Sequence, residues 1–276
     1  MRIFGRRSPA LALPVLALGV LVTLIPFVLT FLTSIKYQID ILTGAWVFRP
    51  TLDNYTHLFF SLQSNFIVNT VNSLVVASVA TALVVVVAAL AGYSLERFRW
   101  PRHTAAIVAG WVLIFHMVPG VTIVGPYYLL FRALGLYDTR LALILSYLVL
   151  NLPMAVWIVQ SFVGDLPMEL EEAAHIDGAS NVRTFVQIVA PLIAPGLAAV
   201  AILSFVFSWN EFLFALNLTA TNAVTIPVGI AKYAQQYVIR YGDMSAAAFF
   251  ATIPAIIVVV LAQRQIVRGL TLGALK

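Results

Sequence analysis

Residues 172–178 read Glu-Ala-Ala-His-Ile-Asp-Gly, a polar stretch that lies between long apolar runs. Of the 276 residues, 62% are hydrophobic and 10% are charged. Soluble globular domains carry roughly 45 to 50% apolar residues, so one soluble core cannot keep this much apolar surface dry. The composition therefore indicates a helical membrane protein that crosses the bilayer several times, and we expect the stretch 172–178 to meet a soluble partner.

Six segments are apolar and long enough to cross a bilayer, which takes about 20 helical residues. The first follows three arginines and so imitates a secretory signal, but its apolar run is about 23 residues against about 7 to 15 for a signal core. We therefore expect it to be retained. The fold class predicted is all-α, an integral membrane protein with a single transmembrane domain over 1–276. Its spans are expected at 10–35, 66–95, 104–130, 141–163, 196–218 and 245–262.

The basic residues predict the orientation of these spans. An even number of spans places both termini on one side, and that side holds ten Lys and Arg against six on the other. The clusters at 2–7 and 97–102 lie directly beside helix ends, where the positive-inside rule is strongest. We therefore expect the termini and the loop 164–195 to be cytoplasmic.

The loop 164–195 is predicted to form a helix, a glycine turn and a second helix. Asp165 is expected to cap the first helix, Gly178 to end it in a left-handed conformation, and Ser180 or Asn181 to cap the second. A surface helix pair with solvated acids would show the same pattern, so these residues alone leave the function of the loop open. The second helix is expected to carry one apolar side made of Val182, Phe185, Val186 and Val189.

The loop resembles the EAA loop of ABC importer permeases. The family pattern is Glu-Ala-Ala, three residues, Gly, nine residues, Ile, one residue, Leu-Pro, and Ala190 stands where the leucine is usual. The residues that match in register are Glu172, Ala173, Ala174, Gly178, Ile188 and Pro191.

Further motifs extend the resemblance over about 65–276. They look like the carbohydrate-uptake permeases of the maltose and glycerol-phosphate type, and within these like the shorter, six-helix subunit of a heterodimer. The motifs are Met-Val-Pro at 117–119, Pro-Tyr-Tyr at 126–128, Gly-Leu-Tyr-Asp-Thr at 135–139, Leu-Pro at 152–153, Trp-Asn-Glu-Phe at 209–212 and Arg-Gly-Leu-Thr-Leu-Gly-Ala at 268–274.

The resemblance implies a permease subunit of an ATP-driven, binding-protein-dependent importer in the cytoplasmic (inner) membrane of a bacterium or archaeon. It implies import of a sugar, oligosaccharide, polyol or glycerol phosphate by alternating access with a homologous permease. The other implied partners are two ATPase subunits, which bind ATP and Mg, and an extracytoplasmic solute-binding protein. The residues expected to dock the ATPase are Glu171, Glu172, Ala173, Ala174, Asp177, Gly178, Ile188 and Pro191.

The residues themselves predict no enzyme and no cofactor in this chain. No Gly-x-x-x-x-Gly-Lys-Ser/Thr phosphate loop occurs, and the only lysines are Lys36, Lys232 and Lys276. The absence of cysteine excludes thiol catalysis and Cys-bearing metal sites. No metal site is expected, because no His-Glu-x-x-His pair exists and the four histidines are scattered at positions 57, 103, 116 and 175.

Two polar groups have competing interpretations. Trp209, Asn210 and Glu211 combine an aromatic ring, an amide and a carboxylate within one helical turn, which suits a sugar pathway. The alternative is that Glu211 makes an inter-helix or inter-subunit polar contact. The segment after 219 is interpreted as a contact for the binding protein, as in the maltose-type family, or as a mere connector. Its candidate contact residues are Lys232, Tyr233, Gln236, Tyr237 and Arg240.

Two other function classes remain open from the residues. An ATP-independent secondary permease or channel is expected to show ionisable relays or repeated halves, and neither is visible in the sequence. A membrane assembly factor would use the loop 164–195 for scaffolding and transport nothing. The identity of the sugar cannot be read from this chain.

Overall fold

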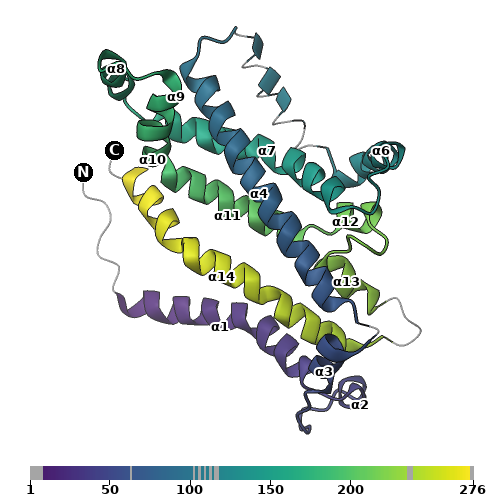
Figure 1. Cartoon of the computed structure of the whole chain (residues 1–276). Coiled ribbons are helices and arrows are strands. Elements are labelled where there is room, and N and C mark those ends of the chain that lie inside the picture. Colours follow the sequence, from purple (N-terminus) through teal and green to yellow (C-terminus); the bar gives the residue numbers. More distant parts are fainter. Residues whose placement is uncertain are drawn as a thin grey trace. The chain divides into compact units, whose positions relative to one another are not determined.

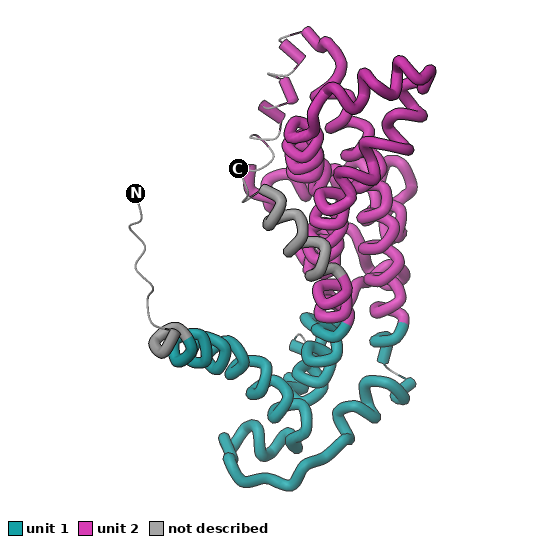
Figure 2. Tube along the Cα trace, turned by 90° about the vertical axis from the view of Figure 1, so that its left-hand side faces the viewer, with its two compact units in different colours: residues 1–67, 229–253 teal, residues 68–228, 254–276 magenta. Residues whose placement is uncertain are grey.

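The computed structural model describes residues 9–62, 64–101, 103–104, 107–108, 110–111, 114, 118–234 and 239–273, with the side chains of 9–12 and 262–273 excepted. Every regular element in these ranges is a helix, which confirms the predicted all-α class (Figure 1). The chain divides into two compact units, one of residues 1–67 and 229–253 and the other of 68–228 and 254–276 (Figure 2). Helices α4, α13 and α14 contribute residues to both units.

Among the described residues, four helices are long and apolar enough to cross a bilayer. Three lie within α1 (Pro9–Ser34), α4 (Phe66–Arg97) and α14 (Tyr241–Gly273), and the fourth is α7 (Arg140–Gly164). They match the predicted spans at 10–35, 66–95, 245–262 and 141–163. A fifth candidate combines 181–192 with 194–210, and the two pieces meet at a bend of 74°.

The predicted third span, 104–130, falls partly on residues outside the described ranges. Its described part contains the start of α6 (Gly120–Ala133), which follows Pro119. Proline lacks the N–H that a helix interior needs, so a helix start directly after Pro119 is consistent with its chemistry. His116 and Met117 lie outside the described residues.

The predicted fifth span, 196–218, is wrong as one continuous helix. Helix α11 (Ala194–Asn210) ends at Glu211, whose backbone is extended (φ −67°, ψ 125°), and α12 (Leu213–Leu218) begins two residues later. The Glu211 carboxylate accepts hydrogen bonds from the backbone N–H groups of Phe214 at 2.9 Å and Ala215 at 3.1 Å. Glu211 therefore caps a new helix, because its side chain offers these N–H groups the acceptor that a helix start lacks.

In the first unit, α3 (Asp53–Phe60) holds the chain that follows α1. The side-chain amide of Asn54 donates to the carbonyl oxygens of Ser34 at 2.8 Å and Lys36 at 2.9 Å. Between these segments lies the short α2 (Gln38–Leu42). A buried core of Leu58, Phe66, Ala246 and Ala247 joins α3 to the first turns of α4 and α14.

In the second unit, α4 packs closely on α7. A Cβ at Gly92 would lie 2.8 Å from Cγ1 of Val159, so only glycine permits this approach of the two helices. Small residues at helix contacts are typical of membrane proteins, where close packing rather than apolar burial drives helix association. The buried core here consists of Val84, Ala88, Tyr93, Ala155, Val156, Val159, Val163, Val189, Ile193 and Val200.

Asp138 fixes the segment 219–225, which follows α12 and precedes α13 (Ile226–Lys232). Its carboxylate accepts from the four backbone N–H groups of residues 220–223, at 2.9 to 3.1 Å. Asp138 has a φ of +58°, a left-handed conformation that aspartate tolerates better than most residues. The same segment is held from α4, because the Asn72 amide donates to the carbonyl oxygens of Asn222 and Val224 at 2.9 Å each.

The local electrostatics keep Asp138 ionised. Burial alone would raise the pKa of its carboxyl, but the N–H groups of residues 220, 222, 223 and 221 together hold that pKa well below its usual range. The carboxylate charge is therefore part of the fold of this loop.

Replacing Asp138 with asparagine removes the charge from these hydrogen bonds. We expect Asp138→Asn to lower the free energy of unfolding by about 2 kcal/mol, since a hydrogen bond to a charged group contributes about 1.5 to 3 kcal/mol. The change can be measured as a lower midpoint of thermal unfolding in detergent. Asp53→Asn is the control, because Asp53 is exposed and the substitution is expected to change stability by less than about 0.5 kcal/mol.

The same variant gives a pH test. A carboxyl whose pKa falls on folding stabilises the fold above its unfolded pKa of about 3.9, and that contribution is lost as the pH falls through the folded value. The stability difference between wild type and Asp138→Asn should be constant above about pH 5 and should shrink below about pH 4. An equal difference at about pH 3 and pH 7 would contradict the role assigned to the charge.

Candidate functional site

The segment after α7 folds into the predicted helix, turn and helix. Helix α8 (Glu169–Ile176) is followed by Gly178 with a φ of +82°, a conformation that L side chains rarely adopt. Helix α9 (Asn181–Thr184) begins after Ser180, whose hydroxyl accepts from the backbone N–H of Arg183 at 3.4 Å. The expected roles of Gly178 and Ser180 are confirmed. The expected cap at Asp165 is wrong, because Asp165 follows the last turn of α7 and α8 begins only after Met168.

The predicted apolar side of the second helix is wrong in its register. Phe185–Val189 form a π-helical turn (η1), which leads into α10 (Ala190–Leu192) and the 74° bend before α11. A π turn has more residues per turn than an α-helix, so residues spaced for one α-helical side separate. Val182 and Val186 are 73% and 58% exposed, whereas Val189 is fully buried.

Glu171 anchors α8 to the ends of two spanning helices. Its carboxylate accepts from Nε of Arg97 at 2.5 Å and from the hydroxyl of Tyr93 at 2.8 Å, and only 5% of Glu171 is exposed. The Arg97 guanidinium also donates to the carbonyl oxygens of Val163 and Leu166, at 2.9 Å each. One ion pair therefore joins the last turn of α4, the end of α7 and the first turn of α8.

The other residues expected to dock an ATPase differ in exposure. Ala174 is buried, as Glu171 is, and Ile188 is half-buried. Those on the surface are Glu172, Ala173, Asp177, Gly178 and Pro191.

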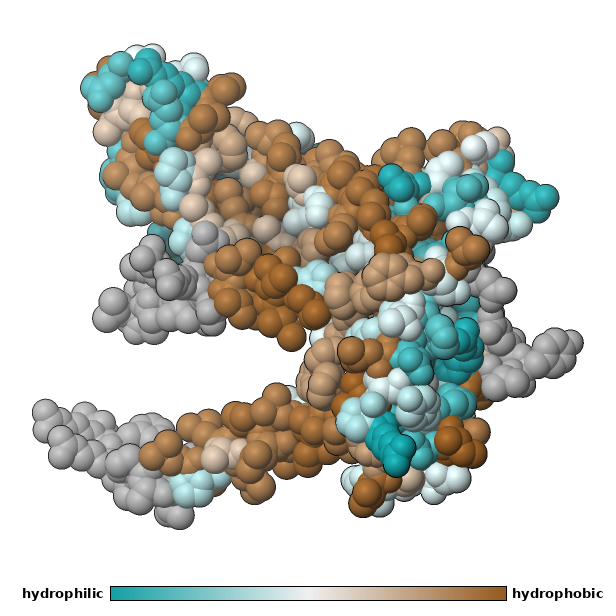
Figure 3. Space-filling view, turned by 60° about the horizontal axis from the view of Figure 1, so that its bottom comes forward, coloured by the Kyte–Doolittle hydropathy of each residue, from teal (hydrophilic) through white to brown (hydrophobic). Residues whose placement is uncertain are grey.

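The loop also exposes apolar side chains. The sequence predicted Val182 and Val186 among them as part of one apolar side, and it did not single out Met168 or Ile176. Figure 3 shows hydrophilic and hydrophobic residues next to one another on the molecular surface. The signal that could have found them is the placement of apolar residues on both sides of a glycine turn in a polar loop. The exposed apolar residues of this loop are Met168, Leu170, Ile176, Val182 and Val186.

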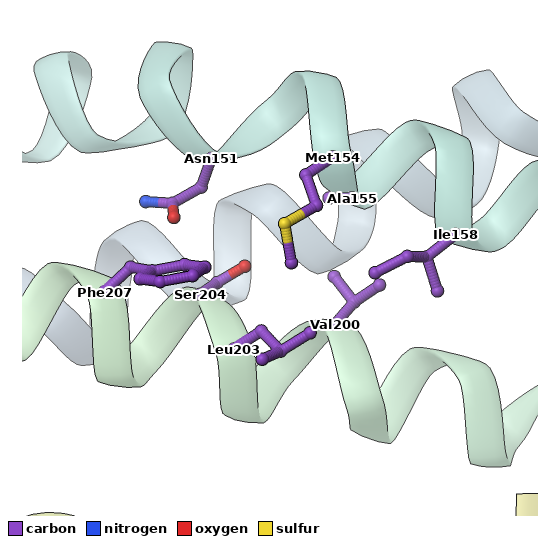
Figure 4. Close-up of a pocket in the computed structure, with 8 residues that line it drawn as sticks. All are labelled: Asn151, Met154, Ala155, Ile158, Val200, Leu203, Ser204 and Phe207. Carbon is purple, nitrogen blue, oxygen red and sulfur yellow. The ribbon is translucent and has the colours of Figure 1, made fainter. Parts of the chain in front are cut away.

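A groove with polar and apolar walls lies between α7 and α11. It contains a hollow of about 300 Å³, and the hydroxyl of Tyr147 donates to Glu211 at 2.9 Å in its wall. Figure 4 shows an adjoining hollow, in which Asn151 and Met154 from α7 face Ser204 and Phe207 from α11. The residues that line the larger hollow are Tyr147, Leu150, Asn151, Met154, Phe207, Ser208 and Glu211.

Only one of the three residues predicted for a substrate pathway lines this groove. Glu211 does, while Trp209 is 3% exposed and stacks on Phe205 with ring centroids 5.8 Å apart. Asn210 is exposed, and its amide donates to the carbonyl oxygen of Val206 at 2.8 Å. The contact of Glu211 with Tyr147 also matches the competing interpretation, an inter-helix polar contact. The sequence reading missed Asn151, Met154, Phe207 and Ser208.

The residues predicted to meet a binding protein differ in their exposure and contacts. Lys232 is exposed at the end of α13, and Tyr233 is half-buried against the core of the first unit. Arg240 is engaged within the chain, since it donates to Asp243 at 2.8 Å and to His57 at 3.0 Å. Gln236 and Tyr237 lie outside the described residues, so the predicted contact stays a prediction.

Residues 65–272 match the family described as "Binding-protein-dependent transport system inner membrane component". The chain belongs to this family. Membership makes it a membrane component of a transport system rather than an enzyme. Of the importer permease, the ATP-independent permease or channel and the assembly factor considered above, the family favours the binding-protein-dependent importer permease.

Curated relatives and solved structures agree with this family. The chain is 38% identical to the trehalose transport system permease protein SugB of Mycobacterium tuberculosis, over 92% of each chain. It is 36% identical to the trehalose/maltose transport system permease protein MalG of Thermococcus litoralis, over 93% of this chain and 92% of that one. A chain of a bacterial ABC transporter involved in alginate import shares the fold, with a TM-score of 0.74 at 20% identity over 96% of this chain and 99% of that one.

Substitutions of the two adjacent glutamates, Glu171 and Glu172, distinguish the buried anchoring residue from its exposed neighbour. We expect Glu171→Ala to lower the free energy of unfolding by about 3 kcal/mol, because it leaves the buried Arg97 without its carboxylate. Glu172→Ala changes an exposed neighbour and is expected to cost less than about 0.5 kcal/mol. Thermal unfolding of both variants in detergent compares them directly. Equal midpoints for the two variants would contradict the anchoring role of Glu171.

Proposed function

We propose that this chain is one of two homologous permease subunits of an ATP-driven importer that takes up a carbohydrate. Family membership supports the importer class, and the names of the relatives support the substrate class. A third relative is the sulfoquinovosyl glycerol transport system permease protein SmoH of Agrobacterium fabrum, 35% identical over 92% of this chain. The observation that carries the proposal is the helix pair α8–α9, which is anchored at its base and exposes acidic and apolar residues together.

In this proposal, α8 and the glycine turn form the EAA coupling loop. The exposed Glu172 and Asp177 meet basic groups of an ATPase subunit, and the apolar side chains of Ile176 and Val182 are buried in the same contact. Glu171 takes no part in docking and instead positions the helix through Arg97. ATP and Mg are bound by the ATPase subunits, and this chain needs no cofactor.

The ion pair at Glu171 then transmits movement of the ATPase to the membrane. Because Arg97 holds α8 to α4 and α7, a displacement of α8 pulls on the ends of both spanning helices. The bend between α10 and α11 is the other route by which the loop acts on the membrane. Alternating access follows if the partner permease moves in the same way.

We place the whole chain in the cytoplasmic membrane as one permease domain with six spans and both termini in the cytoplasm. A solved alginate transporter has been captured with an alginate pentasaccharide-bound periplasmic protein, which supports a solute-binding protein as a further partner here. Lys232, Tyr233, Gln236, Tyr237 and Arg240 remain the candidates for its contact.

Reconstitution tests the proposal. The complex that co-purifies with the tagged chain is placed in liposomes, and the accumulation of labelled trehalose and maltose is measured with and without ATP. We expect a second permease and an ATPase to co-purify and at least one sugar to accumulate only with ATP. Accumulation without ATP by the chain alone would contradict the proposal and support the ATP-independent alternative.

A charge reversal tests the docking role of α8. We expect Glu172→Lys to leave membrane insertion intact and to reduce ATP-dependent uptake at least about tenfold, since like charges across an interface cost several kcal/mol and a factor of ten is about 1.4 kcal/mol. A bulky replacement, Gly178→Val, is expected to act similarly, because the φ of +82° strains any side chain. Asp53→Lys, an equal charge change at an exposed position of α3, is the control. Normal uptake by both α8-loop variants would contradict the docking role.

A further inference from the structure

The groove between α7 and α11 carries more hydrogen-bonding capacity than packing of the two helices uses. The side-chain amide of Asn151 donates to the carbonyl oxygen of Tyr147 at 2.7 Å and to the hydroxyl of Ser208 at 3.2 Å. Both of its N–H groups are thus engaged, while no described residue donates to its amide oxygen. Asn151 therefore presents an acceptor to the hollow that it lines.

Glu211 presents a second acceptor in the same hollow. Its carboxylate accepts from Phe214, Ala215 and Tyr147, whereas an ionised carboxylate has about four lone-pair sites. One acceptor position remains for a donor from outside the chain.

An apolar wall completes the hollow. Phe207 is 52% exposed, and Met154 lines both hollows beside it. An aromatic ring next to a few convergent polar groups is the usual composition of a small-molecule site. The volume of about 300 Å³ lies at the lower end of the range for such sites, about 300 to 1,000 Å³.

These groups select one class of occupant. Lipid chains offer no donors, and exposing the polar atoms of Asn151 and Glu211 to them would cost free energy. A sugar ring supplies both hydroxyl donors at its edge and an apolar C–H face for Phe207. No described residue that lines the hollow is cationic and could neutralise an anion, whereas a sugar without acidic groups needs no such partner.

We propose that the groove is a subsite for one ring of an uncharged carbohydrate on its way through the membrane. Phe207 and Met154 contact the face of the ring, and the amide oxygen of Asn151 and the carboxylate of Glu211 accept hydrogen bonds from its hydroxyl groups. The inference rests on the proposed function and deepens it, since it excludes sugar phosphates and uronic acids as occupants of this groove.

The absence of cysteine in the chain permits a direct test by chemical labelling. Met154→Cys places a thiol in the groove, and Ser161→Cys places one on the same face of α7 about 10 Å further along, at an exposed position that lines neither hollow. Each variant is reconstituted as the full complex. The rate at which N-ethylmaleimide labels this chain is then measured with and without the sugar that the wild-type complex accumulates.

We expect the sugar, at about ten times its Kd, to slow labelling of the Met154→Cys variant about tenfold and to leave the Ser161→Cys variant unchanged. When Phe207→Ala is added to Met154→Cys, the sugar concentration that gives half-maximal protection from labelling should rise roughly tenfold, because the aromatic contact is lost. If Met154→Cys prevents assembly, Ser208→Cys provides another thiol in the same hollow.

Several results would overturn the inference. Equal labelling of the Met154→Cys variant with and without the sugar, in a complex that accumulates it, would show that the sugar passes elsewhere. Slow labelling under both conditions would show that a partner permease covers the groove. Protection by a sugar phosphate or uronic acid would contradict the uncharged class. The absence of ATP-dependent accumulation by the wild-type complex would instead contradict the proposed function itself.

Discussion

The ion pair between Arg97 and Glu171 is the interaction on which the functional end of this protein depends. Both side chains are more than nine-tenths buried, and each is satisfied by further hydrogen bonds, from Tyr93 and to two carbonyl oxygens at the end of α7. A buried charge without such partners would cost several kcal/mol, so the pair forces α4, α7 and α8 to meet in one arrangement. In the proposed function, α8 fixed in this way acts as a lever on the membrane helices through its exposed face.

Elsewhere in the second unit, polar side chains supply the hydrogen-bond acceptors that backbone N–H groups lack where a helix is interrupted. Asp138 supplies acceptors for four consecutive N–H groups, and Glu211 supplies them for the first turn of α12. Both carboxylates thereby support breaks in the helices, where backbone groups would otherwise lack partners. Glu211, at this break, also lines the groove beside α7. Structure and proposed transport function therefore depend on the same residue.

The sequence predicted those features that depend on nearby residues. The apolar segments of α1, α4, α7 and α14 follow from length and composition alone, and Gly178 and Ser180 follow from local backbone chemistry. The features it did not predict depend on distant partners. Glu171 looked like another surface acid because Arg97 lies 74 positions away, and Glu211 accepts a hydrogen bond from Tyr147, 64 positions away. The π turn at 185–189 has no local signal of the kind that a glycine or a capping residue provides.

Site-specific cross-linking from α8 tests the central claim most directly. A thiol introduced by Ala173→Cys lies on the exposed face of α8, in a chain without other cysteines, so a short bifunctional maleimide reagent reports what this face touches in native membranes. The account predicts a cross-link from this position to the ATPase subunit, and none from the same substitution at the exposed Asp53 of α3. A cross-link from α3 but not from α8, or an assembled complex without any cross-link from Ala173→Cys, would contradict it.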